Sequence, residues 1–177
     1  KVIPCYYKKD YPEWSDRGDG PGAPVAIHLP NSPVIATGKR DGSKIRLPNG
    51  NYLEETASYF VMVETKTGGF TPALITMKST QLNVSKKWNS MMKTIQIPDG
   101  KGGFAIPPMH GVVYNLASTL QKNDKGSWYG WVVTQDRIMG QDDKALYLSA
   151  KDFAGNVSKG SVQTKADVEE KTDSTPY

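Results

Sequence analysis

Ser79-Thr80-Gln81-Leu82, continuing through Lys86-Lys87-Trp88, is the stretch in which the spacing of apolar residues changes from two to about 3.6. The apolar side chains that fall near one helix face are Leu82, Trp88, Met91, Met92 and Ile95. Serine is a preferred N-cap residue, so we expect Ser79 to cap this helix. Proline does not continue a helix, so the helix is expected to end before Pro98.

Strand patterns lie on both sides of this helix. Two apolar runs, residues 57–64 and 70–77, are joined by a short loop with two glycines, which predicts an antiparallel pair. After the helix, residues 111–119 and 127–134 predict a second hairpin. Asn49-Gly50 supplies the backbone angles of a tight turn, so residues 44–53 predict a third hairpin.

The remaining segments complete the expected fold. Residues 2–11 are rich in aromatic and β-branched side chains and predict a first strand, and residues 142–156 predict a second helix. We expect a surface loop over residues 15–24, where three glycines and two prolines stand among charged residues.

The order of strands, one helix and a hairpin is typical of a small oligonucleotide-binding (OB) barrel. We therefore predict a mainly β protein with two helices. It would be an OB-fold-like five-stranded barrel with one helix between strands 3 and 4 and a C-terminal helix. We expect residues 1–157 to form a single domain, and residues 158–177 to be a polar, mildly acidic and disordered tail.

Charge and cysteine content narrow the class of protein. The net charge of the 177-residue chain is +4, and the lysine and arginine excess lies before the acidic end of the chain. A single Cys5 excludes an internal disulfide and a cysteine-based zinc site, which favours a reducing compartment. No apolar run is long enough to predict a membrane span, and no signal segment opens the chain.

Aromatic and cationic side chains alternate along the predicted strands. Single-stranded nucleic acid exposes base faces and phosphates, so a receptor for it needs stacking rings beside lysine or arginine. Side chains alternate across a strand, so members of one strand two residues apart share a face. The binding residues that we predict are Tyr7, Lys9, Tyr11, Lys78, Lys87, Tyr129 and Trp131. The competing interpretation is that the rings are core and the helix lysines a solvated face.

Catalytic patterns are weak. The two histidines, His28 and His110, lack metal-ligand spacing and a nucleophile nearby in the sequence. The adjacent acids Glu54-Glu55 and Asp142-Asp143 do not face one another in a strand or a helix, as acid–base catalysis would require. The sequence therefore predicts no enzyme activity, no metal site and no cofactor.

Several segments together resemble a family of tailed-bacteriophage proteins. They are Val2-Ile3-Pro4-Cys5-Tyr6-Tyr7, Asn51-Tyr52-Leu53-Glu54-Glu55-Thr56, Met77-Lys78-Ser79-Thr80-Gln81-Leu82, Lys87-Trp88-Asn89-Ser90-Met91-Met92, Pro107-Pro108-Met109 and Asn123-Asp124-Lys125-Gly126-Ser127-Trp128. The resemblance implies single-stranded-DNA binding on an OB barrel, with little sequence preference. It places the protein in phage DNA replication or recombination, in the cytoplasm of the infected bacterial host.

The sequence also suggests partners and alternative functions. Single-stranded DNA is the expected partner, with replication or recombination proteins meeting the C-terminal tail, no membrane contact, and a homo-oligomer as one option. The runner-up hypothesis is a phage structural or assembly protein that uses the same aromatic surfaces for protein contacts. A third is an inhibitor of a host nuclease.

Overall fold

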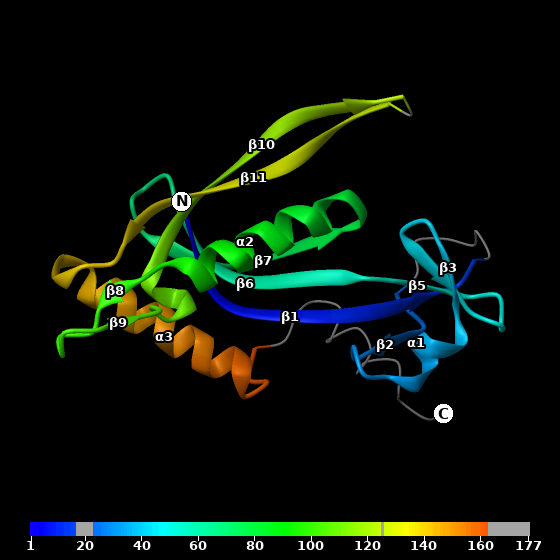
Figure 1. Ribbon diagram of the computed structural model, residues 1–177, viewed down its shortest axis with the longest axis horizontal. Coiled ribbons are helices and arrows are strands. Elements are labelled where there is room, and N and C mark those ends of the chain that lie inside the picture. The colour runs from blue at the N-terminus through cyan, green and yellow to red at the C-terminus, as the bar shows by residue number, and fades with distance from the viewer. Residues whose placement is uncertain (17–22, 125, 163–177) are drawn as a thin grey trace.

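The computed structural model of the protein describes residues 1–16, 23–124 and 126–162. Its organising element is β1 (Val2–Trp14), a long strand that runs through most of the length of the molecule, as Figure 1 shows. β1 takes part in two groups of strands, one along its length and one at its C-terminal end. It therefore connects the two ends of the fold.

The larger group is an antiparallel sheet built around β1. β6 (Thr56–Glu64) pairs along β1, and β7 (Phe70–Lys78) pairs with β6. At the start of β1, Val2 pairs with Tyr114 of β10 (Val112–Asn123), and β11 (Gly126–Ile138) pairs with β10. The strand order is β7–β6–β1–β10–β11.

The smaller group extends the C-terminal end of β1. Its elements are β2 (Ala26–His28), α1 (Pro33–Thr37), β3 (Lys39–Asp41), β4 (Lys44–Arg46) and β5 (Tyr52–Glu54). Its apolar cluster consists of Tyr11, Ile45, Leu47 and Leu53. Within the described residues, both groups join into one nine-stranded sheet, and β8 (Ile97–Pro98) pairs separately with β9 (Phe104–Ala105).

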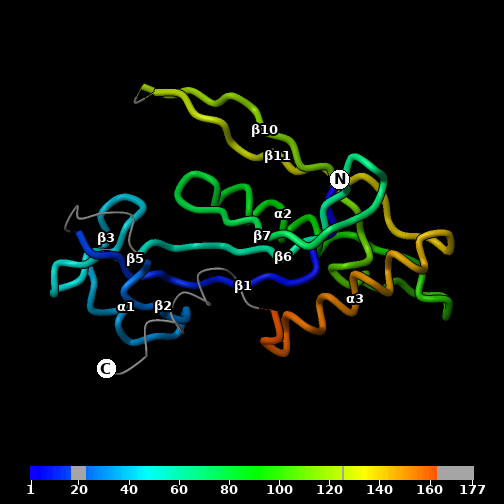
Figure 2. Tube along the Cα trace, turned by 180° about the vertical axis from the view of Figure 1, so that it is seen from behind, coloured from blue at the N-terminus to red at the C-terminus, as the bar shows by residue number. Residues whose placement is uncertain are grey.

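Two long helices cover opposite faces of the main sheet (Figure 2). α2 (Leu82–Thr94), preceded by the 3₁₀ helix η1 (Ser79–Gln81), packs Trp88 on the face that contains Val2 and Tyr114. α3 (Lys144–Ser158) packs Ala150 on the other face, with Ile3 and Val113. The 3₁₀ helices η2 (Met109–Gly111) and η3 (Gln141–Asp143) precede β10 and α3. Adjacent residues of one strand, such as Val2 and Ile3, therefore pack into cores on opposite faces of the sheet, because side chains alternate along a strand.

Most local predictions are confirmed. The three predicted hairpins appear as β4–β5, β6–β7 and β10–β11, and both predicted helices are present. The N-cap prediction was wrong. Ser79 has a left-handed φ of 48° and begins η1, so α2 starts three residues later.

The five-stranded OB barrel is not confirmed. Among the described residues β7 pairs with β6 alone and β11 with β10 alone, so the sheet is curled but open, and it has more strands than predicted. Most of the predicted loop over residues 15–24, and residues 163–177 of the predicted tail, lie outside the described residues.

Candidate nucleic-acid interface

A groove lies between α2 and the β10–β11 hairpin. Its volume is about 300 Å³, and Trp131, Lys87 and Met91 are among the residues that line it. Trp131 is half-buried and packs at the edge of the central core, whereas Lys87 is exposed on α2. Figure 1 shows the hairpin running above α2 and away from the main sheet. A ring and a cation therefore meet in one concave site.

Two glutamine side chains lie where the hairpin comes close to the start of α2. The Oε1 of Gln81 accepts a hydrogen bond of 2.9 Å from the backbone N–H of Trp131. Gly130 is buried beside them. A Cβ at Gly130 would lie 2.5 Å from Nε2 of Gln121 and 2.6 Å from Nε2 of Gln81. Glycine at this position therefore leaves room for both amide groups beside the hairpin backbone.

The two segments that line the groove carry mainly positive charge. Residues 65–98, which include β7 and all of α2, contain five lysines and no aspartate or glutamate. Lys86 and Lys87 are exposed on α2, and Lys122 is exposed on β10. In residues 112–135 the one carboxylate is that of Asp124, near the hairpin tip. Along these two segments lysines therefore outnumber carboxylates, a charge balance that favours contact with phosphate.

An exposed aromatic residue continues this surface toward the hairpin tip. Tyr129 shares a strand face with Trp131 and is 73% exposed. Its cross-strand partner is Leu120, which is 53% exposed. The hairpin thus carries an apolar and aromatic pair that the described part of the protein leaves open to solvent.

The other predicted binding residues lie elsewhere. Lys9 pairs with Glu55 at 2.7 Å, and Lys78 pairs with Glu54 at 2.9 Å. Tyr11 is 8% exposed and belongs to the core of the smaller strand group. Tyr7 packs on Tyr59, with ring centroids 4.9 Å apart, and lines a separate hollow on the other flank of α2. Of the seven residues, the structure brings Lys87 and Trp131 together, with Tyr129 farther along the same strand.

The amino-acid sequence of the chain matches a known phage protein family. The family model of the Pam3 phage gp34-like protein matches residues 1–163. The chain belongs to this family. The match confirms the expected phage affiliation, and the family description names no ligand. No curated protein and no solved structure matches the chain.

A buried carboxylate ties three segments of this gp34-like protein together. Glu13 accepts hydrogen bonds from the side chains of Asn51, Asn49 and His28, at 2.6, 3.1 and 2.7 Å. The bonds from Asn51, His28 and Asn49, in that order, hold the pKa of Glu13 below its usual value. The second ring nitrogen of His28 lies 3.4 Å from the Ser32 hydroxyl. The network connects β1, β2 and the β4–β5 turn, a contact that sequence spacing alone did not reveal.

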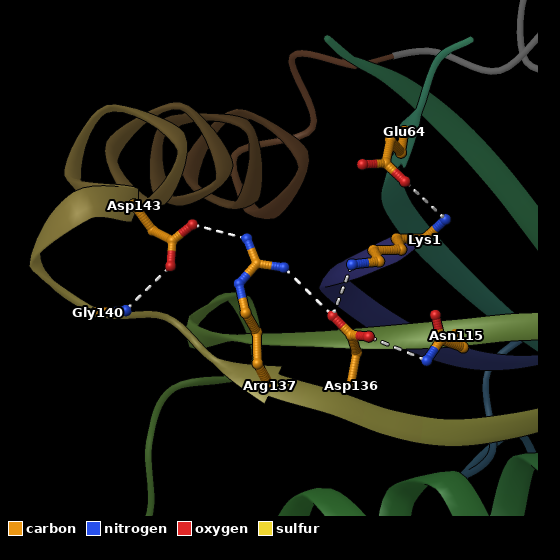
Figure 3. Close-up of polar contacts among 7 residues, drawn as sticks. All are labelled: Lys1, Glu64, Asn115, Asp136, Arg137, Gly140 and Asp143. Atoms are coloured by element: carbon orange, nitrogen blue, oxygen red, sulfur yellow. Dashed lines mark hydrogen bonds and ion pairs between the residues drawn. The ribbon is translucent and has the colours of Figure 1, made fainter. Parts of the chain in front are cut away.

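A second polar network, drawn in Figure 3, fastens the end of β11 to α3. Arg137 bridges Asp136 at 3.2 Å and Asp143 at 2.7 Å. Lys1 reaches the same Asp136 at 3.1 Å. The Arg137 guanidinium, helped by the backbone N–H of Gly140, holds the pKa of Asp143 below its usual value. The network thereby fixes the base of the hairpin.

Three further observations concern metal binding, membrane crossing and thiol chemistry. Among the described residues, no three acidic, histidine or cysteine side chains are grouped to hold a metal ion. In the same part of the chain, no helix has both the length and the apolar character needed to cross a membrane. Cys5 is buried against α3, and this burial raises the pKa of its thiol to about 12, which makes it a poor nucleophile.

Proposed function

We propose that this gp34-like protein binds single-stranded DNA in the groove between α2 and the β10–β11 hairpin. The observation that carries the proposal is the coincidence of Trp131 and Lys87 in one groove, with Lys87 on a stretch, residues 65–98, that has no aspartate or glutamate. Unpaired strands require stacking rings beside cations, and this groove supplies both.

The proposed mode of binding is stacking plus phosphate contact, with little sequence preference. Bases would stack on Trp131 and Tyr129, since every base has a flat face to offer. Phosphates would meet Lys86, Lys87 and Lys122, whose charges give affinity without reading sequence. The protein would sequester unpaired DNA during phage replication or recombination in the infected host, with no chemical step.

The topology of the main sheet supports an OB-like ancestry. Counted along the chain, its five long strands lie in the order third, second, first, fourth, fifth, and α2 lies between the third and the fourth. Pairing of β7 with β11 would close these strands into a barrel. We propose that the sheet is an open form of the OB barrel, a fold whose loops commonly hold oligonucleotides.

A salt titration of oligo-dT binding, followed by tryptophan fluorescence, tests the charge part of the proposal. Affinity is expected to fall linearly on a log–log plot, with a slope of about −0.7 for each phosphate contacted. The double variant Lys86→Gln/Lys87→Gln should bind more weakly, and its slope should be shallower by about 0.7 for each phosphate that the missing lysines would neutralise. Lys151→Gln/Lys159→Gln, which removes two exposed lysines in and directly after α3 on the opposite face of the sheet, is the matched control and should behave as the wild type.

Ring removal tests the stacking part. Tyr129→Ser should weaken oligo-dT binding by about 1–3 kcal/mol, the value of one stacked base, while the salt slope stays that of the wild type. Tyr129 is exposed, so this change should leave the fold intact. Wild-type protein that shows no salt-dependent affinity for oligo-dT would overturn the proposal.

A phage assembly role is the second candidate, and the hairpin favours it. Leu120 and Tyr129 form an exposed cross-strand pair on a projecting arm, and exposed apolar patches often mark protein interfaces. In that case Leu120→Ser would change the association state of the protein in sedimentation experiments. Oligo-dT affinity would be absent in the wild type.

A further inference from the structure

The second flank of α2 carries a hollow of its own. Its volume is about 280 Å³, and it is lined by Tyr7, Asn89, Met92, Lys93, Pro107 and Met109. These residues come from β1, α2 and the segment that leads into η2. The hollow is therefore built where three separate parts of the chain meet, rather than on one exposed surface.

The two flanks of α2 have matching chemistry. The groove beside β11 combines Trp131 with Lys87 and a methionine. The hollow on the other side combines Tyr7 with Lys93 and two methionines. Lys93, like Lys87, is exposed. Six residues separate the two lysines, which corresponds to about 9 Å along the helix axis. One extended strand can span that interval in a few nucleotides.

Asn89 adds a side-chain amide, as Gln121 does in the first groove. Its side chain lies beside the Tyr59 hydroxyl. An amide offers two N–H donors and an oxygen with two lone pairs, so one contact leaves capacity for another partner. Apolar walls, one ring, a few polar groups and a cation at the rim are what a nucleotide pocket requires.

We infer that this hollow is a second nucleotide subsite, filled by a base of the same DNA strand after it crosses α2 from the groove. The inference rests on the proposed function. The base would lie against Tyr7 and the methionines, Asn89 would meet its polar edge, and Lys93 would meet the adjoining phosphate.

Oligo-dT of graded length tests the subsite. In the wild type, affinity should rise once when the groove fills and again when the strand is long enough to cross α2. The second rise should be about 5–150-fold for one stacked base, and Asn89→Leu/Lys93→Gln should reduce it while leaving short oligomers unaffected. Lys86→Gln/Lys87→Gln should instead weaken binding at every length.

The outcomes separate the two proposals. A variant Asn89→Leu/Lys93→Gln that matches the wild type at every length overturns the subsite and leaves the groove standing. A wild type without affinity for any length overturns both. Ultraviolet crosslinking with 5-iododeoxyuridine placed singly along the oligomer gives an independent readout in the unaltered protein. Crosslinks to Tyr7 or Met109 are expected from one or two adjacent positions, and their absence at all positions overturns the subsite.

Discussion

Trp88 stands where α2 crosses the main sheet. Its indole stacks on Tyr59, with ring centroids 4.4 Å apart, and meets the edge of Tyr114 at 5.6 Å. The side chain is fully buried, and its Nε1 has no hydrogen-bond partner among the described residues. Packing alone therefore holds this ring, and through it the helix that forms one wall of both proposed DNA sites.

Truncation of this ring should be costly. We expect Trp88→Ala to lower the free energy of unfolding by about 3–5 kcal/mol, because it leaves a cavity between helix and sheet. Trp88→Phe should cost less, since it keeps a ring and removes no hydrogen bond. Urea denaturation measures both, with Lys86→Ala on the exposed side of α2 as the control. Equal stability of Trp88→Ala and the control would contradict the packing described here.

The candidate site shows what strand alternation predicts and what it leaves open. Alternation correctly indicates that Tyr7, Lys9 and Tyr11 share a face. It does not say which neighbours cover that face, because the covering elements are distant in sequence. Glu55 pairs with Lys9, and the strands around Leu53 bury Tyr11. Trp131 is only half-buried, because it packs at the edge of the core and lines the groove.

At the scale of elements, one side-chain hydrogen bond joins the hairpin to η1, immediately before α2. Gln81→Leu removes the acceptor for the Trp131 N–H and leaves that donor unpaired, at an expected cost of about 1 kcal/mol. Hydrogen exchange at the Trp131 amide should become faster in this variant. Exchange in β6, on the far side of α2, should change less, and equal acceleration of both would contradict a local role for Gln81.

The junction between β11 and α3 should be sensitive to acid. The folded-state pKa of Asp143 lies below its unfolded value of about 3.9, so its contribution to stability is present above that value. It is lost as the pH falls through the lower folded-state pKa. Asp143→Asn should therefore flatten the dependence of melting temperature on pH below about 4. An unchanged profile would show that Arg137 does not stabilise the charged carboxylate.

The whole molecule is organised by one strand that enters each apolar cluster. Val2 contributes to the core under α2, Ile3 to the core under α3, and Tyr11 to the core of the smaller strand group. Because β1 is common to all three, we expect the described residues to unfold in one cooperative step.

A core substitution at one end tests this cooperativity. Leu53 is fully buried in the smaller group, and Leu53→Ala should cost about 2–5 kcal/mol. Native-state hydrogen exchange should show the same loss of protection in β6 as in β5. Loss confined to the amides of β3, β4 and β5 would show that the smaller group opens by itself.

The sequence predicts the local parts of this fold better than their assembly. Asn49-Gly50 specifies a turn by its own backbone preference, and the change of period at Leu82 specifies α2. Closure of the sheet is different, because it depends on whether β7 and β11 meet, and no local signal reports that distance. The short elements α1, β2 and β3 also escape prediction, since prolines and glycines interrupt their patterns.

The gap between β7 and β11 has a mechanical consequence. In a closed barrel, backbone hydrogen bonds between neighbouring strands fix the radius. A wider barrel would require some of these hydrogen bonds to break. Here no backbone hydrogen bonds join β7 to β11, so their separation is set by packing against α2 and the core, and a change in that separation would break no strand pairing. A polymer bound beside α2 would therefore lie in an open cleft rather than in a closed channel.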